Sequence, residues 1–286
     1  MKSSTFNNRK TASAGRPTYI EVEPNVNLHI TDLGEGPAVV LIPGYPLGNE
    51  TYEYQYHTLI EAGYRVISIT MRGFGLSDKP YGTYDFDVFA DDIKVVLETL
   101  EIENAVLGGH SMGGAIALHF TAKYNGEHIS KLALFSAATP RHTKLPDYDF
   151  PLFTKEDVTS WIELLKVDRP AMLGAVGSKL TLNADSLNAG IGAWLGASSS
   201  LAAPYAMDKA LTALCDSDLR DDLPKINVPT IIFHAVDDAI VAYAMAQQLH
   251  QGIKDARLVT FEKSGHLTYL EETPKFNEEF LKFIKE

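Results

Sequence analysis

Residues 105–118 read AVLGGHSMGGAIAL, and the architecture of the chain follows from this stretch. An apolar run at 105–107 leads into glycines that flank Ser111 on both sides, and Ala, Ile and Leu then follow at helical spacing. This order predicts a strand, a sharp turn and a helix, with the serine hydroxyl projecting from the turn. Side chains at 109 and 113 would collide with neighbouring backbone in so tight a turn, which explains glycine at both positions. We interpret the stretch as a nucleophile elbow.

The rest of the chain alternates short β-branched runs with helical patterns. Strands without polar alternation are those of a sheet covered on both faces, so we predict an α/β fold with a mostly parallel sheet. A polar–apolar alternation before these runs predicts an initial two-stranded hairpin, 18–23 with 26–33. The further predicted strands are 38–42, 65–70, 104–109, 131–136, 229–234 and 256–262, and the predicted helices are 49–62, 86–100, 112–124, 242–252 and 273–285.

Residues 139–223 break this alternation and predict a helical cap. The interval has helical spacing at 154–167, 183–201 and 204–216 but no convincing strand. It follows the strand 131–136, which places it over the carboxyl edge of the sheet, where open α/β folds bind ligands. We interpret the glycine-containing runs 174–179 and 190–192 as flexible joints, since neither has the spacing of a phosphate-binding loop. The predicted domains are a disordered tail (1–17), a core (18–138 and 224–286) and the cap (139–223).

Composition excludes several classes of protein. A net charge of −12 over 286 residues argues against a nucleic-acid surface. The single cysteine, Cys215, forms no internal disulfide, and no run of ~18 apolar residues predicts a membrane span. The first residues lack the apolar segment of a secretion signal, so we predict a cytoplasmic location. No Cys/His cluster predicts a metal, and the oligomeric state is not predicted.

A serine hydroxyl becomes a nucleophile when a base takes its proton and an acid orients that base. In an elbow fold the acid and then the histidine follow in loops after late strands. Of the nine histidines, His266 alone follows the last predicted strand at a strand-to-helix loop. We expect His110 to point away from the site and to pack.

The acid comes from one of two consecutive aspartates after the strand 229–234. A His-Gly-x-x-Asp pattern counted from His234 selects Asp238 and leaves Asp237 as a solvated loop residue or a helper. The loop after 131–136 offers only alanines at 137 and 138, which favours the later loop. The predicted triad is therefore Ser111, Asp238 and His266.

Acyl transfer also needs two backbone donors for the oxyanion that develops on the substrate carbonyl. The amide of Met112, directly after the serine, is one candidate. The second candidate is the amide of Tyr45 in the loop PGYPLG (43–48). Pro46 has no amide hydrogen and cannot donate.

These features resemble the α/β-hydrolase superfamily over residues ~18–286. The segments LIPGYPLGNETYEYQ (41–55), YRVISITMRGFGLSDKP (64–80), the run 84–114 that ends in the elbow and SGHLTYLEETPKFNEEFLKFI (264–284) are similar to the cofactor-free haloperoxidase, perhydrolase and arylesterase branch. The resemblance implies an eight-stranded sheet with a helical cap, a Ser/Asp/His triad, no cofactor and hydrolysis of small carboxylic esters. It also implies reaction with hydrogen peroxide to give peracids, because members that favour peroxide often carry a proline where Pro46 stands.

Two departures from the family pattern concern substrate preference more than mechanism. Relatives usually have His-Gly at 43–44, where this chain has Pro-Gly, and Asp before the Arg-Gly-x-Gly-x-Ser stretch, where this chain has Thr70-Met71-Arg72. Ser111 excludes a haloalkane dehalogenase or epoxide hydrolase, which need aspartate at the elbow. A lactonase, an amidase or lactamase, a carbon–carbon bond hydrolase and a non-catalytic ligand-binding protein stay open. The cap residues that suit either an apolar pocket or a core are Trp161, Met172, Leu173, Trp194, Tyr205 and Met207.

Overall fold

The computed structural model describes residues 15–150 and 153–286. Its strands form one sheet of eight in the order β1-β2-β4-β3-β5-β6-β7-β8. The β1–β2 hairpin is antiparallel, β2 is antiparallel to β4, and every later pair is parallel, which confirms the predicted mostly parallel sheet. The strands are β1 (Tyr19–Glu23), β2 (Val26–Leu33), β3 (Ala38–Ile42), β4 (Arg65–Ile69), β5 (Ala105–His110), β6 (Ile129–Phe135), β7 (Thr230–Ala235) and β8 (Ala256–Phe261).

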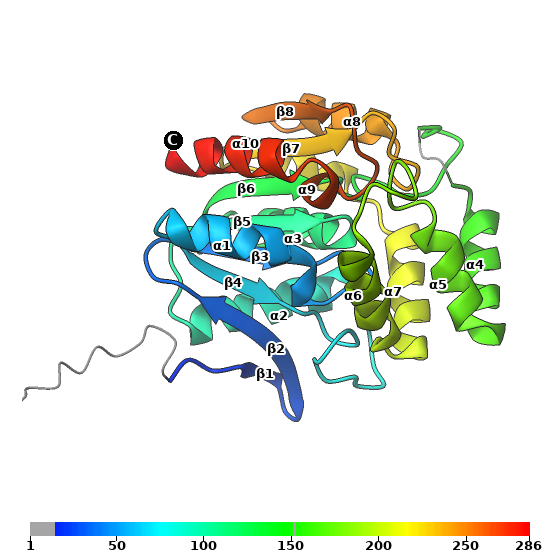
Figure 1. Ribbon diagram of the computed structural model, residues 1–286, viewed down its shortest axis with the longest axis horizontal. Coiled ribbons are helices and arrows are strands. Elements are labelled where there is room, and N and C mark those ends of the chain that lie inside the picture. Colours follow the sequence, from blue (N-terminus) through cyan, green and yellow to red (C-terminus); the bar gives the residue numbers. More distant parts are fainter. Residues whose placement is uncertain (1–14, 151–152) are drawn as a thin grey trace, which may run out of the picture.

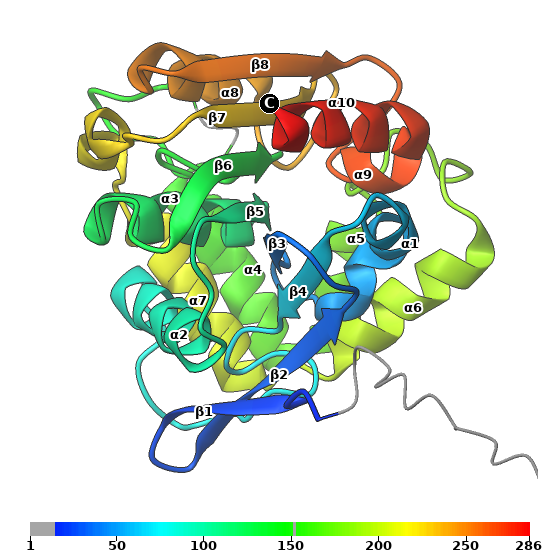
Figure 2. The same ribbon diagram turned by 90° about the vertical axis from the view of Figure 1, so that its left-hand side faces the viewer.

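Helices cover both faces of this sheet (Figure 2). Aromatic side chains of α1 and α10 pack on one face, whereas α2, α3 and α8 pack on the other. Strands β3, β5 and β7 are buried along their whole length, which is why they lack polar alternation. The helices of the core are α1 (Glu53–Glu61), α2 (Phe86–Thr99), α3 (Met112–Lys123), α8 (Tyr243–Gly252), α9 (Thr268–Glu271) and α10 (Thr273–Lys285), with short 3₁₀ turns η1 (Asn49–Tyr52) and η2 (Arg220–Lys225).

Four helices between β6 and β7 stand beyond the carboxyl ends of the parallel strands (Figure 1). They are α4 (Lys155–Val167), α5 (Arg169–Gly177), α6 (Ala189–Ser200) and α7 (Pro204–Asp216). No helix in the described ranges is both long and apolar enough to cross a bilayer.

The prediction of two flexible joints in this region is wrong, because helices occupy most of both runs. Helix α5 extends through Gly177, and α6 contains Gly190 and Gly192. The helix expected over 183–201 begins only at 189. Glycine disfavours helix, but the Asp168 and Asn188 side chains accept hydrogen bonds from backbone amides in the first turns of α5 and α6. Such N-caps offset the weak propensity of the residues that follow.

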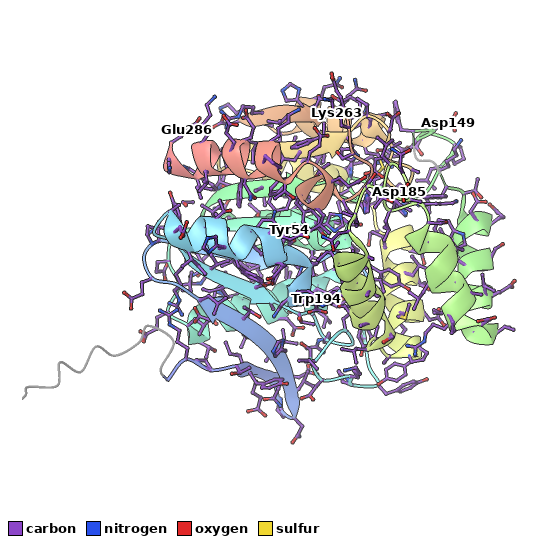
Figure 3. All side chains as sticks on the ribbon, in the orientation of Figure 1. Tyr54, Asp149, Asp185, Trp194, Lys263 and Glu286 are labelled. Carbon is purple, nitrogen blue, oxygen red and sulfur yellow. The ribbon has the colours of Figure 1, made fainter. Side chains whose placement is uncertain are left out.

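Helix α6 is attached to the core at two points. The Asn188 side-chain amide donates to the Tyr54 hydroxyl at 2.8 Å, and the Gly48 backbone amide donates to Ser198 Oγ at 2.8 Å. Figure 3 labels Tyr54 on α1 and Trp194 on the neighbouring α6. Through Ser198, helix α6 therefore contacts the loop after β3, which carries the candidate oxyanion donor.

At the other end of the chain, residues 1–14 of the predicted tail lie outside the described residues. Arg16 is described, and its guanidinium donates to Asp32 Oδ1 at 2.8 Å and to the Gly34 carbonyl at 2.7 Å. Arg16, which falls within the predicted tail, thus has defined contacts with the core.

Candidate active site

Ser111 lies between the end of β5 and the start of α3. Its backbone has φ 53° and ψ −120°, a region that non-glycine residues rarely adopt. A Cβ at Gly109 would lie 2.3 Å from the Gly113 carbonyl oxygen, and a Cβ at Gly113 would lie 2.4 Å from the Ile42 carbonyl oxygen. Neither position has room for a side chain. The local geometry is that of the elbow predicted from the motif.

His266 lies on the loop between β8 and α9, and its ring contacts a buried carboxylate. Nδ1 of His266 is 2.8 Å from Asp238 Oδ2, and the two side chains are almost fully buried. The other oxygen, Oδ1, accepts hydrogen bonds from the backbone amides of Ile240 and Val241 at 2.8 and 2.9 Å. Asp237, the alternative acid, is exposed. An ionised Asp238 accepts a hydrogen bond from Nδ1–H and leaves Nε2 free to accept a proton.

The surroundings of Asp238 keep it ionised. Burial acts to raise the pKa of this carboxyl, but the charge and hydrogen bond of His266, then His234 and the Val241 amide, outweigh it and lower the pKa to about 2. A buried carboxylate that stays charged at neutral pH can stabilise a protonated imidazole beside it.

Ser111 and His266 open onto one small cavity. Its volume is about 80 Å³, and Tyr45 joins them in the lining. Ser111 Oγ has no hydrogen-bond partner among the described residues and stays accessible from this cavity. In sites without substrate the contact between nucleophile and base is often longer than a hydrogen bond. The other lining residues come mainly from α4, α5, α7 and adjoining loops: His142, Trp161, Leu164, Met172, Ala175, Val176, Lys179, Leu180, Leu211, Leu214 and Ile240.

A wider cleft of about 460 Å³ adjoins this cavity between α5 and α6. Tyr45, Val176 and Leu180 line both, so the two spaces share a wall. The cleft is also lined by glycines at which an added Cβ would meet nothing within 4 Å: Gly174, Gly177, Gly192 and Gly196. Close packing does not require glycine at these positions, and the absence of a side chain there leaves the cleft open.

The two candidate oxyanion donors flank the serine. In the part of the chain that the structure describes, neither the Tyr45 amide nor the Met112 amide has a hydrogen-bond partner. Gly44 allows the Tyr45 loop to lie close to the elbow, because a Cβ there would lie 2.5 Å from His110 Nδ1 and 3.1 Å from Ser111 Cβ. The peptide bond between Tyr45 and Pro46 is cis.

His110 differs from the expectation that it points away from the site. Its ring packs against that of His266 with centroids 4.6 Å apart, and against Tyr269 at 4.9 Å. Nε2 of His110 lies 3.1 Å from the His266 carbonyl oxygen, so it donates a hydrogen bond there. Burial, and then the neighbouring His266, hold the pKa of His110 well below its usual range, so this ring is neutral. His110 does pack, but against the loop that carries the candidate base.

Sequence reasoning missed His142, which lines the cavity with Ser111 and His266. The available signal was position, since this histidine follows the carboxyl end of β6 at the edge where the site forms. The residues expected to form either an apolar pocket or a core divide three ways. Trp161 and Met172 line the cavity, Met207 is fully buried in the core, and Trp194, which is 51% exposed, does neither.

Among residues 15–150 and 153–286, no group of three His, Cys, Asp or Glu side chains is placed to hold a metal ion. The single cysteine, Cys215, is buried and unpaired in α7, and burial raises the pKa of its thiol to about 12. A protonated, covered thiol is a poor nucleophile. Ser111 is therefore the nucleophile candidate at this site.

Comparison with known proteins identifies the class. Residues 37–273 match the sequence model of the α/β hydrolase fold family, and the chain belongs to that family. The AB hydrolase superfamily protein YisY of Bacillus subtilis (strain 168) is 40% identical over 259 residues, which span 91% of this chain and 96% of that protein.

Two further relatives place the chain more narrowly. The non-heme chloroperoxidase CPO-A1 of Kitasatospora aureofaciens is 29% identical over 91% of this chain and 96% of its own. The solved esterase EaEST of Exiguobacterium antarcticum has 36% identity and a TM-score of 0.91 and covers 95% of this chain and 100% of that one. These matches confirm the resemblance to the cofactor-free haloperoxidase branch of the α/β-hydrolases.

Proposed function

We propose that this α/β-hydrolase is a serine esterase that cleaves small carboxylic esters through an acyl-enzyme intermediate. The observation that carries the proposal is the 2.8 Å contact between His266 Nδ1 and Asp238, with Ser111 lining the same cavity. This arrangement supplies a base, its orienting acid and a nucleophile. The esterase named among the solved relatives supports an ester bond as the target.

The reaction proceeds in two halves. In the first, His266 Nε2 takes the proton of the Ser111 hydroxyl while Oγ attacks the ester carbonyl. The Tyr45 and Met112 amides donate to the oxyanion. The protonated His266, stabilised by Asp238, then gives its proton to the leaving alcohol. In the second half a water molecule loses a proton to His266, attacks the acyl carbon and releases the acid and the free Ser111.

We place the two halves of the ester in the two spaces of the site. The carbonyl and its nearest groups would lie in the cavity of about 80 Å³ above Ser111. The longer half extends past Val176 and Leu180 into the cleft between α5 and α6. Residues 139–223 would then act as a cap that shields the acyl-enzyme from bulk water.

Hydrogen peroxide is a second acceptor for the acyl group. It would replace water in the second half, lose one proton to His266 and leave as the peracid. Pro46 lines the cleft and stands where members of the branch that favour peroxide often carry a proline, and this resemblance supports the reaction. Lactones, amides and carbon–carbon bonds activated by a carbonyl remain alternative substrates of the same triad. The cytoplasmic location and the absence of a nucleic-acid partner stay predictions.

Hydrolysis of p-nitrophenyl acetate tests the proposal. The Ser111→Ala variant should lose activity to the background rate and keep the melting temperature of the wild type, since the change removes one oxygen. The matched control is Ser160→Ala, an exposed serine on α4, which should keep full activity. Undiminished turnover by Ser111→Ala would remove this residue as nucleophile. Ligand binding with no turnover on any ester, lactone or amide would favour the non-catalytic alternative.

A further inference from the structure

Several polar residues that line the cavity above Ser111 either take part in the proposed reaction or face solvent. Ser111 and His266 belong to the proposed reaction, and Lys179 is exposed at the rim. The other lining residues with polar side-chain groups are Trp161, which is partly exposed, His142 and Tyr45. Of these, His142 and Tyr45 each carry a buried polar atom with no hydrogen-bond partner in the described chain.

His142 is the more buried of these two residues. It is 3% exposed, and its ring packs beside that of Phe153 with centroids 5.6 Å apart. Its Nδ1 is the buried atom without a partner. Buried polar groups in folded proteins nearly always have a partner, because leaving one unpaired costs free energy. The small accessible part of the ring opens onto the cavity that it lines.

The ring of His142 is neutral at neutral pH. Burial, and then the neighbouring His266, lower its pKa to about 4, although Asp238 acts in the opposite direction. A neutral imidazole has one donor and one acceptor nitrogen, so it can hydrogen-bond to a hydroxyl or a carbonyl. It has no place in the triad, because Asp238 is bonded to His266.

The rest of the lining is largely apolar, with leucine, methionine and tryptophan side chains from the cap. A wholly apolar substrate would fill this space and leave the His142 ring nitrogens without partners. A substrate with a second oxygen at the right place would satisfy one of them. Binding sites that are mostly apolar commonly fix orientation with a few such polar groups.

We propose that His142 is a specificity residue that hydrogen-bonds to a second oxygen of the substrate, a hydroxyl or keto group within a few bonds of the scissile ester. The inference rests on the proposed esterase function and narrows its substrate class from simple esters to oxygen-substituted ones. The second oxygen lies on either the acyl half or the alcohol half, and the experiment separates these two cases.

Two pairs of esters test the proposal. Methyl butyrate and methyl 3-hydroxybutyrate differ by one hydroxyl on the acyl half, and ethyl acetate and 2-hydroxyethyl acetate differ by one on the alcohol half. For each ester, kcat/KM is divided by the rate of alkaline hydrolysis to remove intrinsic reactivity. We expect the wild type to prefer the hydroxylated member of at least one pair by roughly 3- to 10-fold, the range of one neutral hydrogen bond. No preference in either pair would overturn the proposal without any variant.

The variants assign this preference to a residue. His142→Phe should bring the preferred pair to a ratio of about 1 while the plain ester is still hydrolysed, and His142→Gln, which keeps a donor and an acceptor, should retain part of it. Leu164→Met, a change of similar volume in the same lining, should leave the ratio unaltered. A ratio that survives His142→Phe but is lost in Tyr45→Phe would overturn the proposal in favour of the tyrosine hydroxyl. Wild type that hydrolyses none of the four esters or p-nitrophenyl acetate would instead refute the proposed function.

Discussion

Replacing Asp238 by asparagine changes the tautomer of His266. Oδ1 of Asp238 accepts two backbone amides, at 2.8 and 2.9 Å, so the asparagine oxygen must remain at that position. The asparagine NH₂ then lies where Oδ2 is now, 2.8 Å from His266 Nδ1. Two donors cannot face each other, so Nδ1 loses its proton and Nε2 carries it. An Nε2 that already bears a proton cannot accept one from the Ser111 hydroxyl.

The expected loss follows from this change of tautomer. When the triad aspartate of a chymotrypsin-like serine protease is replaced by asparagine, kcat falls by about 10⁴ although the geometry is intact. That factor corresponds to about 5–6 kcal/mol of transition-state free energy. We expect a loss of similar size for Asp238→Asn here, because the Ile240 and Val241 amides keep the asparagine oxygen at the Oδ1 position and so direct its NH₂ group toward His266.

The assay is kcat on p-nitrophenyl acetate at pH 7 to 8, with the melting temperature as a check on folding. The matched control is Asp237→Asn, one residue earlier and exposed, for which kcat should change by less than about twofold. A folded Asp238→Asn variant that keeps more than a tenth of wild-type kcat would show that the tautomer of His266 does not control the reaction. A larger loss in Asp237→Asn would move the acid by one position.

Three further results are expected. Gly113→Ala should destabilise the protein by about 3 kcal/mol in urea unfolding, because its Cβ would lie 2.4 Å from two carbonyl oxygens, whereas Gly192→Ala, with nothing within 4 Å, should stabilise α6 by up to about 1 kcal/mol; equal effects would contradict the steric explanation of the elbow glycines. The folded-state pKa of Asp238, about 2, lies below its ordinary value of 3.8. Its ionised form therefore adds about 2 kcal/mol of stability, which is complete above pH ~5 and is lost as the pH falls toward 2. The free energy of unfolding measured from pH 2 to 6 should fall less steeply with decreasing pH in Asp238→Asn than in the wild type, and identical slopes would count against the ion pair. Gly196→Leu fills part of the cleft and should lower the ratio of kcat/KM for p-nitrophenyl octanoate to kcat/KM for p-nitrophenyl acetate by roughly 10-fold. Ala197→Leu, on the exposed side of α6, should leave this ratio unchanged. Equal ratios in the two variants would place the longer half of the ester elsewhere.

The sheet and its connections could be predicted from sequence because local patterns determine them. The hairpin around Asn25 and the buried strands on either side of Ser111 follow from alternation and from its absence, and they occur within a residue or two of the expected bounds. Counting from His234 selects Asp238 rather than Asp237, and Asp238 is the aspartate whose carboxylate contacts His266. In each case the signal lies within a few residues of the feature that it predicts.

What could not be predicted from the sequence depends on contacts between distant segments. Helix α5 and the start of α6 contain several glycines and show no clear apolar stripe in the sequence. Their N-cap residues alone are too weak a signal to predict a helix. His110 and His142 look like other histidines in the sequence. Their positions near the candidate site arise only when the end of β5 and the loops after β6 and β8 come together, which places one ring against His266 and the other in the lining of the cavity. No periodicity in the sequence predicts such a contact between distant segments.

The proposed function requires that the Ser111 oxygen form a covalent bond to the acyl carbon of the substrate. This can be measured by mass spectrometry of the protein after reaction with a fluorophosphonate, which stays bonded to an activated serine because water releases it slowly. We predict one adduct per chain, located on the peptide that contains residue 111, with labelling strongly slowed in Asp238→Asn. An adduct on another serine, or no adduct on a folded protein that hydrolyses esters, would show that Ser111 is not the nucleophile.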